Sequence, residues 1–120
     1  MQRDMDLIRE ILIQMADHDH GYAPNVEVSG HSKEEVGFHI WLMGDAKLIK
    51  TVDVTTTTDT SPDAIPIHLT WQGYEFLEAA RNQGAWETGK KLVLSKAGGL
   101  SFELLKAYLI FEAKHRLGIG

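Results

Sequence analysis

The opening segment of the chain carries apolar residues at helical spacing. The residues at i, i+1, i+4, i+5 and i+8 are Leu7, Ile8, Ile11, Leu12 and Met15. This spacing places them on one face of a helix, and Asp4 or Asp6 suits its amino end. The pattern predicts a helix over 4–16. After a turn at 21–24, the alternation in Val26-Glu27-Val28 predicts one short strand.

A second helix is predicted over 33–46. Ser32 is a good N-cap, and Glu35 follows three residues later, as in a capping box. Helical periodicity places Val36, His39 or Ile40, and Met43 on the inward face. The outward positions are then Glu34, Gly37, Phe38, Trp41 and Asp45.

A β-hairpin is predicted after this helix. Leu48-Ile49 enters the run 51–58, whose β-branched valines and threonines favour a strand over a helix. Ser61-Pro62-Asp63 has turn chemistry, and 65–69 forms the returning strand, in which Pro66 indicates an edge position. The hairpin therefore extends from about 51 to 69.

The rest of the chain is predicted to be helical. Thr70 caps a helix over 71–82, whose inward residues are Tyr74, Leu77 and Ala80. A short helix follows at 85–96. Ser101 caps a last helix that ends at Gly118, a residue type suited to the position after a helix.

The order of these elements predicts the fold class. Helix, short strand, helix, hairpin and helix is the plan of a winged helix-turn-helix domain with a two-stranded wing, an α+β fold. One of its usual three helices is absent or reduced between Pro24 and Ser32. A length of 120 residues fits a single domain over 1–120, with a helical C-terminal extension at about 85–118.

Sequence segments spread over most of the chain are similar to those of one family. They are 3–9, 38–43, 46–49, 69–77 and 98–102. The chain resembles domain of unknown function 2513, a family of small winged-helix-like proteins of bacteria and their prophages. The resemblance implies that fold and assigns no activity. Where a glycine commonly ends the second helix in such patterns, this chain has Lys47, so another helix stop is expected there.

A second, broader likeness concerns the hairpin and its flanks. Leu48-Ile49, the hairpin, and then Leu69-Thr70 with Gly73 resemble the end of the recognition helix, the wing and the following helix of small winged-helix transcription regulators. The resemblance implies that Leu69 packs, that Thr70 caps, and that Gly73 lets its helix approach the wing.

Composition indicates where the protein works. The chain has no cysteine, so a disulfide framework is excluded and a reducing, cytoplasmic setting is expected. Its start lacks the pattern of a signal peptide, and its apolar runs are far shorter than the ~20 residues that span a bilayer. A soluble protein without a membrane partner is expected.

No group of residues has the pattern of a catalytic site. Cysteine is absent, no serine lies in a Gly-x-Ser-x-Gly elbow, and no phosphate-binding glycine loop occurs. The sequence therefore predicts a binding protein, not an enzyme, with no cofactor. His18, His20, His31 and His39 are candidate metal ligands by residue type, but neighbours in the polar run 17–20 point in different directions, so no metal site is expected. His39 is instead expected to be a core histidine bonded to backbone.

Two binding hypotheses remain open. The first is a prophage or accessory-gene regulator that binds duplex DNA. It is preferred narrowly over the second because winged helices so often bind DNA. Its contacts would be made by basic and hydroxyl side chains at the end of the second helix and in the wing, namely Lys47, Lys50, Thr55, Thr56, Thr57 and Thr58.

The alternative hypothesis is a protein-interaction module, such as a phage-encoded inhibitor, adaptor or antitoxin-like partner. The outward face of the second helix offers acids and aromatics, Glu34, Phe38, Trp41 and Asp45, where a DNA-reading helix offers bases and amides. Exposed together, Phe38 and Trp41 would make an apolar patch typical of protein contacts. Burial of Trp41 under the C-terminal helices is the other possibility.

The apolar pattern of the last helix predicts self-association. It is apolar on more than one face, more than one core-facing stripe requires. A homodimer through Leu105, Tyr108 and Leu109 would cover the excess, while a helix enclosed within the monomer is the alternative.

Overall fold

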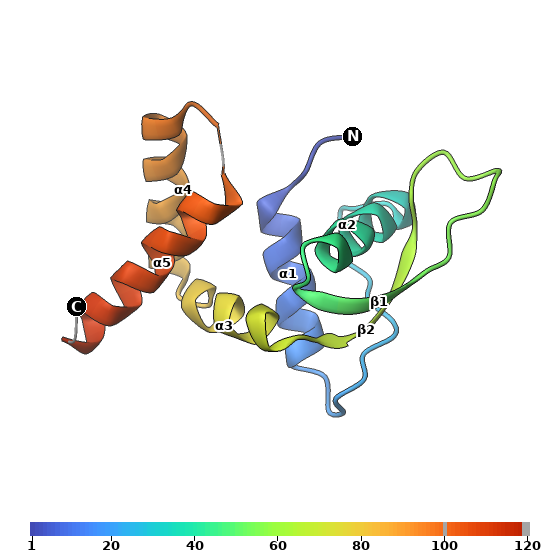
Figure 1. Cartoon of the computed structure of the whole chain (residues 1–120), viewed down its shortest axis with the longest axis horizontal. Helices are drawn as coiled ribbons and strands as arrows, with labels where there is room; N and C mark the ends of the chain where they lie inside the picture. The colour runs from blue at the N-terminus through green and yellow to red at the C-terminus, as the bar shows by residue number, and fades with distance from the viewer. Residues whose placement is uncertain (100, 119–120) are drawn as a thin grey trace. The chain divides into compact units, whose positions relative to one another are not determined.

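The computed structural model describes residues 1–99 and 101–118. Within them the chain forms five helices and one antiparallel two-stranded sheet (Figure 1), which confirms the predicted α+β class. The elements are α1 Met5–Ala16, α2 Lys33–Asp45, β1 Ile49–Asp53, β2 Ala64–Leu69, α3 Trp71–Ala80, α4 Gln83–Ala97 and α5 Phe102–Leu117. Two compact units divide the chain, Met1–Tyr74 and Glu75–Gly120, with the boundary inside α3. A single domain over 1–120 stays a prediction.

Short polar residues define where the helices begin. Asp4 Oδ1 accepts the amides of Asp6 and Leu7 at 3.0 and 3.1 Å, and Ser32 Oγ accepts the amide of Glu35 at 3.1 Å. The hydroxyls of Thr70 and Ser101 do the same for α3 and α5. Each bond satisfies an amide that the first helical turn leaves free. The predicted helix starts are therefore confirmed to within two residues.

The core of the first unit is formed by α1, α2 and the hairpin. The apolar stripe predicted for α1 is buried in full, together with Met5. From α2 come Val36, Ile40 and Met43. Leu48, Ile49, Ala64 and Leu69 add the inner face of the hairpin. Burial of each large aliphatic side chain contributes about 1.5–3 kcal/mol.

Lys47 itself ends α2, so the prediction of another helix stop is wrong. Its φ is +63°, in the left-handed region. The Lys47 amide bonds to the Gly44 carbonyl and the Leu48 amide to the Met43 carbonyl, both at 3.0 Å. These two bonds form a Schellman motif with lysine in the position that glycine usually takes.

Replacing Lys47 with glycine is expected to raise the free energy of unfolding by about 1 kcal/mol. The Cβ of a non-glycine residue costs roughly 1–2 kcal/mol in this conformation, and the greater freedom of glycine in the unfolded chain offsets part of the gain. Urea denaturation measures the change. Lys47→Ala is the control, because it keeps the Cβ and should stay at wild-type stability; an equal gain in both variants would contradict the explanation.

The hairpin is confirmed, but its first strand is shorter than predicted. β1 pairs with β2 from Ile49 opposite Leu69 to Asp53 opposite Ala64. The register shifts after Lys50, so that Ile67 is unpaired and its carbonyl accepts the Ala23 amide at 2.8 Å. Thr55–Thr58 lie in the loop that joins the strands, not in a strand.

The predicted strand at Val26–Val28 is wrong. Residues 22–28 follow no regular secondary structure. The Glu27 carbonyl accepts the Gln14 side-chain amide at 2.8 Å, a contact to α1. Alternation of side chains alone does not make a strand when no second strand bonds its backbone.

Two predicted orientations are also wrong. Gly37 is buried, and the Asp63 carboxylate lies so close that it would collide with a Cβ at this position. Tyr74 is 42% exposed, and Phe76, which the sequence pattern overlooked, is fully buried in its place. Leu77 and Ala80 are buried as predicted.

The second unit is built around large apolar side chains of α3, α4 and α5. Phe76 contacts the rings of Trp86 and Phe102, with centroids 6.2 and 4.9 Å away. Gly89 lets α5 approach α4, because an added Cβ would lie 2.8 Å from a ring carbon of Tyr108. The left-handed Gly98 and Gly118 end α4 and α5.

The residues chosen for a dimer interface are mostly covered within the chain. Leu105 and Leu109 are completely buried and Tyr108 is half-buried. Two of the three therefore offer no surface to a second copy. The large apolar side chains that the described part of α5 leaves exposed are Leu104, Phe111 and Leu117. Dimerisation itself stays a prediction. Among the described helices, none has the length and apolar character to cross a membrane.

Candidate functional site

The loop at the tip of the hairpin is organised by carboxylates. Thr55 donates its hydroxyl to Asp53 Oδ1 at 2.7 Å and its amide to the same oxygen at 3.0 Å. The Thr56 amide donates to Asp59 Oδ2 at 2.8 Å, and the hydroxyls of Thr56 and Thr58 lie 3.2 Å apart. Three of the four threonines proposed for DNA contacts therefore have hydrogen bonds within the loop.

Glu34 connects this loop to the start of α2. Thr60 and Ser61 donate their hydroxyls to Glu34 Oε1 at 2.5 and 2.8 Å. These bonds, that of Thr60 first, hold the pKa of Glu34 below its ordinary value of 4.5. Glu34 is exposed and carries its negative charge at neutral pH.

Trp41 lies beside the hairpin, not free on the outer face of α2. Its indole Nε1 donates to Asp53 Oδ2 at 3.1 Å, and its side chain is half-buried, as is Phe38. The two aromatics therefore do not form the exposed patch that the sequence suggested, whereas Asp45 is exposed. The hydroxyl and then the amide of Thr55, followed by the Trp41 indole, hold the pKa of Asp53 below its ordinary value of 3.8.

The hairpin exposes a different apolar pair. Val52 and Ile65 are opposite each other in the register, and they are 49% and 43% exposed. Farther along the hairpin Lys50 pairs with His68, whose ring lies 6.1 Å from that of the exposed Tyr22. A signal for this pair is visible in the sequence, because Val52 and Ile65 are apolar residues within the two predicted strands.

The two remaining DNA-contact candidates are exposed. Lys47 lies at the end of α2 and Lys50 in β1. They belong to a strongly acidic unit: Met1–Tyr74 carries 5 Lys or Arg and 12 Asp or Glu, a net charge of −7. The unit Glu75–Gly120 carries 7 Lys or Arg and 5 Asp or Glu, a net charge of +2. Negative charge thus concentrates in the unit that contains the hairpin.

A cleft of about 760 Å³ is lined by the irregular segment that contains Val26–Val28, where a strand was predicted. Residues 24–31 form one wall, and Asp63–Pro66 at the start of β2 form another. Val36 and Ile40 of α2 add to its apolar lining.

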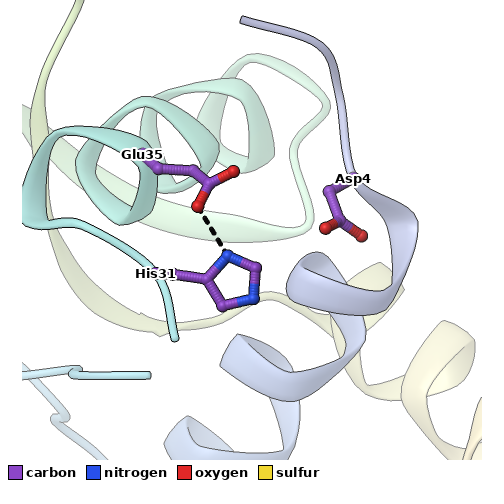
Figure 2. Close-up of side chains that lie close together, drawn as sticks. All are labelled: Asp4, His31 and Glu35. Carbon is purple, nitrogen blue, oxygen red and sulfur yellow. Dashed lines mark hydrogen bonds and ion pairs between the residues drawn. The ribbon is translucent and has the colours of Figure 1, made fainter. Parts of the chain in front are cut away.

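Asp4, His31 and Glu35 come together between the start of α1 and the start of α2. Figure 2 shows the three side chains around one space, with His31 Nδ1 bonded to Glu35 Oε1 at 2.6 Å. Their ligand-type atoms all lie within 4.8 Å of one another, and all three side chains are half-buried. The sequence indicated His31 as a candidate metal ligand, but not its neighbours Asp4 and Glu35; the spacing of His31 and Glu35, four residues apart at a helix start, was the local signal for the cluster.

His39 supports this cluster from the core. It is fully buried, donates Nδ1–H to the Glu35 carbonyl at 2.8 Å, and accepts the Asp4 amide at Nε2, also at 2.8 Å. The prediction of a core histidine bonded to backbone is confirmed. His18 and His20 are exposed, with ring centroids 5.9 Å apart, and they do not belong to the cluster.

The chain is thus an α+β protein with a helix, a hairpin and a capped helix in succession. It matches the family model described as "Hypothetical protein (DUF2513)" over residues 2–99, and it belongs to that family. A protein of Haemophilus influenzae strain Rd named "Uncharacterized protein" is 32% identical over 108 residues, which cover 88% of this chain and 90% of that protein. No solved structure matches the chain. The family predicted from the sequence is confirmed.

Proposed function

We propose that the unit Met1–Tyr74 is a non-enzymatic, winged-helix binding module whose partner is a protein with a basic surface. In this assignment α2 takes the place of the recognition helix and the hairpin takes the place of the wing. Thr70 and Gly73 then close the wing against the next helix, as the broader resemblance implies. The observation that carries the choice of partner is the charge of this unit, a net of −7.

Charge weighs against nucleic acid as the main partner. Duplex DNA is bound through neutralisation of its phosphates by lysine and arginine. Glu34 and Asp53, whose depressed pKa values keep them ionised, lie at the α2 and wing surface together with the exposed Asp45 and Asp59. The same carboxylates favour a basic protein surface and would accelerate its association.

The exposed pair Val52 and Ile65 supplies an apolar centre for such an interface. Contiguous apolar surface on a hairpin is typical of protein contacts when polar residues surround it. Asp53 follows Val52 directly, and the carboxylates of the wing loop follow Asp53 along the chain. A partner with an apolar contact residue bordered by lysines or arginines fits this arrangement.

Duplex DNA is kept as the second candidate because of Lys47 and Lys50. Both are exposed at the corner between α2 and the hairpin, where a winged helix approaches the phosphate backbone. The prophage-regulator hypothesis depends on these two lysines and on Thr57. Of the four loop threonines Thr55–Thr58, Thr57 is the one whose hydroxyl makes no hydrogen bond with the described loop residues.

Two double variants separate the candidates. Partners are captured by crosslinking from an extract of the source cell, and each captured protein is purified and measured for direct binding. Val52→Thr with Ile65→Thr is expected to weaken protein binding by about 2 kcal/mol, the effect of removing central apolar contacts. Lys47→Glu with Lys50→Glu is expected to change the association rate and to leave the dissociation rate unchanged.

A gel-shift assay at low salt provides the other arm of the test. We expect the wild type to shift no duplex DNA. A shift that disappears in the double lysine variant, weakens steeply with salt and survives the threonine changes would replace the protein proposal with the DNA one. Threonine keeps the β-branch of both residues, so the variants retain strand preference, and circular dichroism checks their fold.

A further inference from the structure

We propose that Asp4, His31 and Glu35 form a binding site for one Zn²⁺ ion. The three residues supply one imidazole nitrogen and two carboxylate groups, ligand types that zinc takes in proteins. They come from three different places in the first unit: the N-cap of α1, the loop before α2 and the first turn of α2. Their convergence in Figure 2 is therefore a property of the tertiary fold.

The distances fit a zinc site after small side-chain movements. Bonds of about 2.0–2.2 Å in tetrahedral geometry place ligand atoms about 3.3 Å apart. His31 Nδ1 and Glu35 Oε1 are closer, at 2.6 Å, because they share a hydrogen bond; the cluster as a whole spans up to 4.8 Å. An ion that takes the place of the shared proton would separate the first pair and draw Asp4 inward.

The surroundings hold the ligands in position. His39 bonds to the backbone of both carboxylate residues, at the Asp4 amide and the Glu35 carbonyl. The amides of Asp6 and Leu7 both donate to Asp4 Oδ1, which orients this carboxylate and leaves Oδ2 for a ligand bond. Such supporting hydrogen bonds are typical of metal sites and tune their affinity.

The ligand set indicates zinc over the harder cations. Mg²⁺ and Ca²⁺ prefer oxygen ligands alone, whereas an imidazole suits zinc. Three protein ligands leave a fourth position for water or for a group of a bound molecule. In the intact protein the ion would cross-link the beginning of α1 to the beginning of α2. These two places are separated in the chain by α1 itself and by the irregular segment that follows it.

Calorimetric titration of the chelator-treated full chain with zinc chloride tests the site. We expect one equivalent to bind. At a free zinc concentration one hundred times the Kd, the unfolding equilibrium constant should fall about a hundredfold. Visible d–d absorption of Co²⁺ in place of Zn²⁺ gives a second readout that does not depend on stability.

Three ligand variants and one control decide the assignment. Asp4→Asn, His31→Ala and Glu35→Gln should each weaken binding at least tenfold, since even supporting residues of metal sites contribute about 10–100-fold. Asparagine is a good N-cap, so Asp4→Asn keeps the helix start while removing the charge. His18→Ala with His20→Ala should bind like the wild type. The proposal is overturned if the wild type binds no zinc at micromolar to submillimolar concentrations, or if the three ligand variants bind zinc as tightly as the wild type.

Discussion

Replacing Gly73 with alanine is expected to lower the free energy of unfolding by about 3 kcal/mol, the upper part of the range for a forced steric contact. A Cβ at this position would overlap the carbonyl oxygen of Leu48. That oxygen belongs to the backbone, and it also accepts the amide and the hydroxyl of Thr70, each at 3.0 Å. The contact can be relieved only by moving α3 away, which would break both bonds.

The sign of this effect is what makes the prediction specific. In an ordinary helix, glycine to alanine gains about 1 kcal/mol. Gly84→Ala is the matched control, because a Cβ there meets no atom closer than Asn82 Oδ1 at 3.4 Å, and a small gain is expected. Urea denaturation followed by circular dichroism compares the two. If Gly73→Ala were also neutral or stabilising, α3 would not approach the α2–β1 turn as closely as described.

Features set by neighbouring residues could be predicted from the sequence. The caps at Asp4, Ser32, Thr70 and Ser101 depend on a side chain that bonds to an amide two or three residues ahead. That chemistry is local, so the helix starts were predicted closely. Likewise, the role of Gly73 followed from the resemblance to winged-helix regulators.

Features set by distant residues could not be predicted. Val26–Val28 alternates like a strand, but whether a strand forms depends on hydrogen bonds with another strand, and here β2 bonds to Ala23 instead. Gly37 was placed outward by helical periodicity, which contains no information about the Asp63 side chain that lies against it. Lys47 shows a third limit: the backbone tolerates lysine where glycine is the usual choice.

The same distinction between neighbouring and distant residues applies to the candidate sites. The concentration of acids in the first half of the chain is visible in the sequence, and it anticipates the charge of the unit Met1–Tyr74. The cluster of Asp4 with His31 and Glu35 is not visible in the sequence, because Asp4 is brought to the other two residues by the packing of α1 against α2. Thr55–Thr58 of the hairpin loop were proposed as DNA contacts by analogy with winged helices, but the hydrogen bonds of Thr55 to Asp53 and of Thr56 to Asp59 depend on the loop conformation.

Replacing His39 with leucine is also expected to lower the free energy of unfolding by about 3 kcal/mol. The imidazole is fully buried and joins two elements, since it accepts the Asp4 amide and donates to the Glu35 carbonyl. Leucine fills much of the volume but leaves the Asp4 amide without its acceptor. An unsatisfied buried donor costs about 1–3 kcal/mol, and the altered shape of the side chain adds about 1 kcal/mol.

His39→Gln separates the hydrogen bond from the volume of the ring. The glutamine amide oxygen can reach the place of Nε2 and accept the Asp4 amide, so we expect a loss of only about 1 kcal/mol, the ordinary contribution of one hydrogen bond. Urea denaturation ranks the three proteins, and hydrogen exchange at the Asp4 amide reports the bond itself. Exchange should be fastest in the leucine variant and close to wild type in the glutamine variant. Equal stability of both variants would mean that the ring contributes through packing alone, and that the Asp4 bond does not hold α1 to α2.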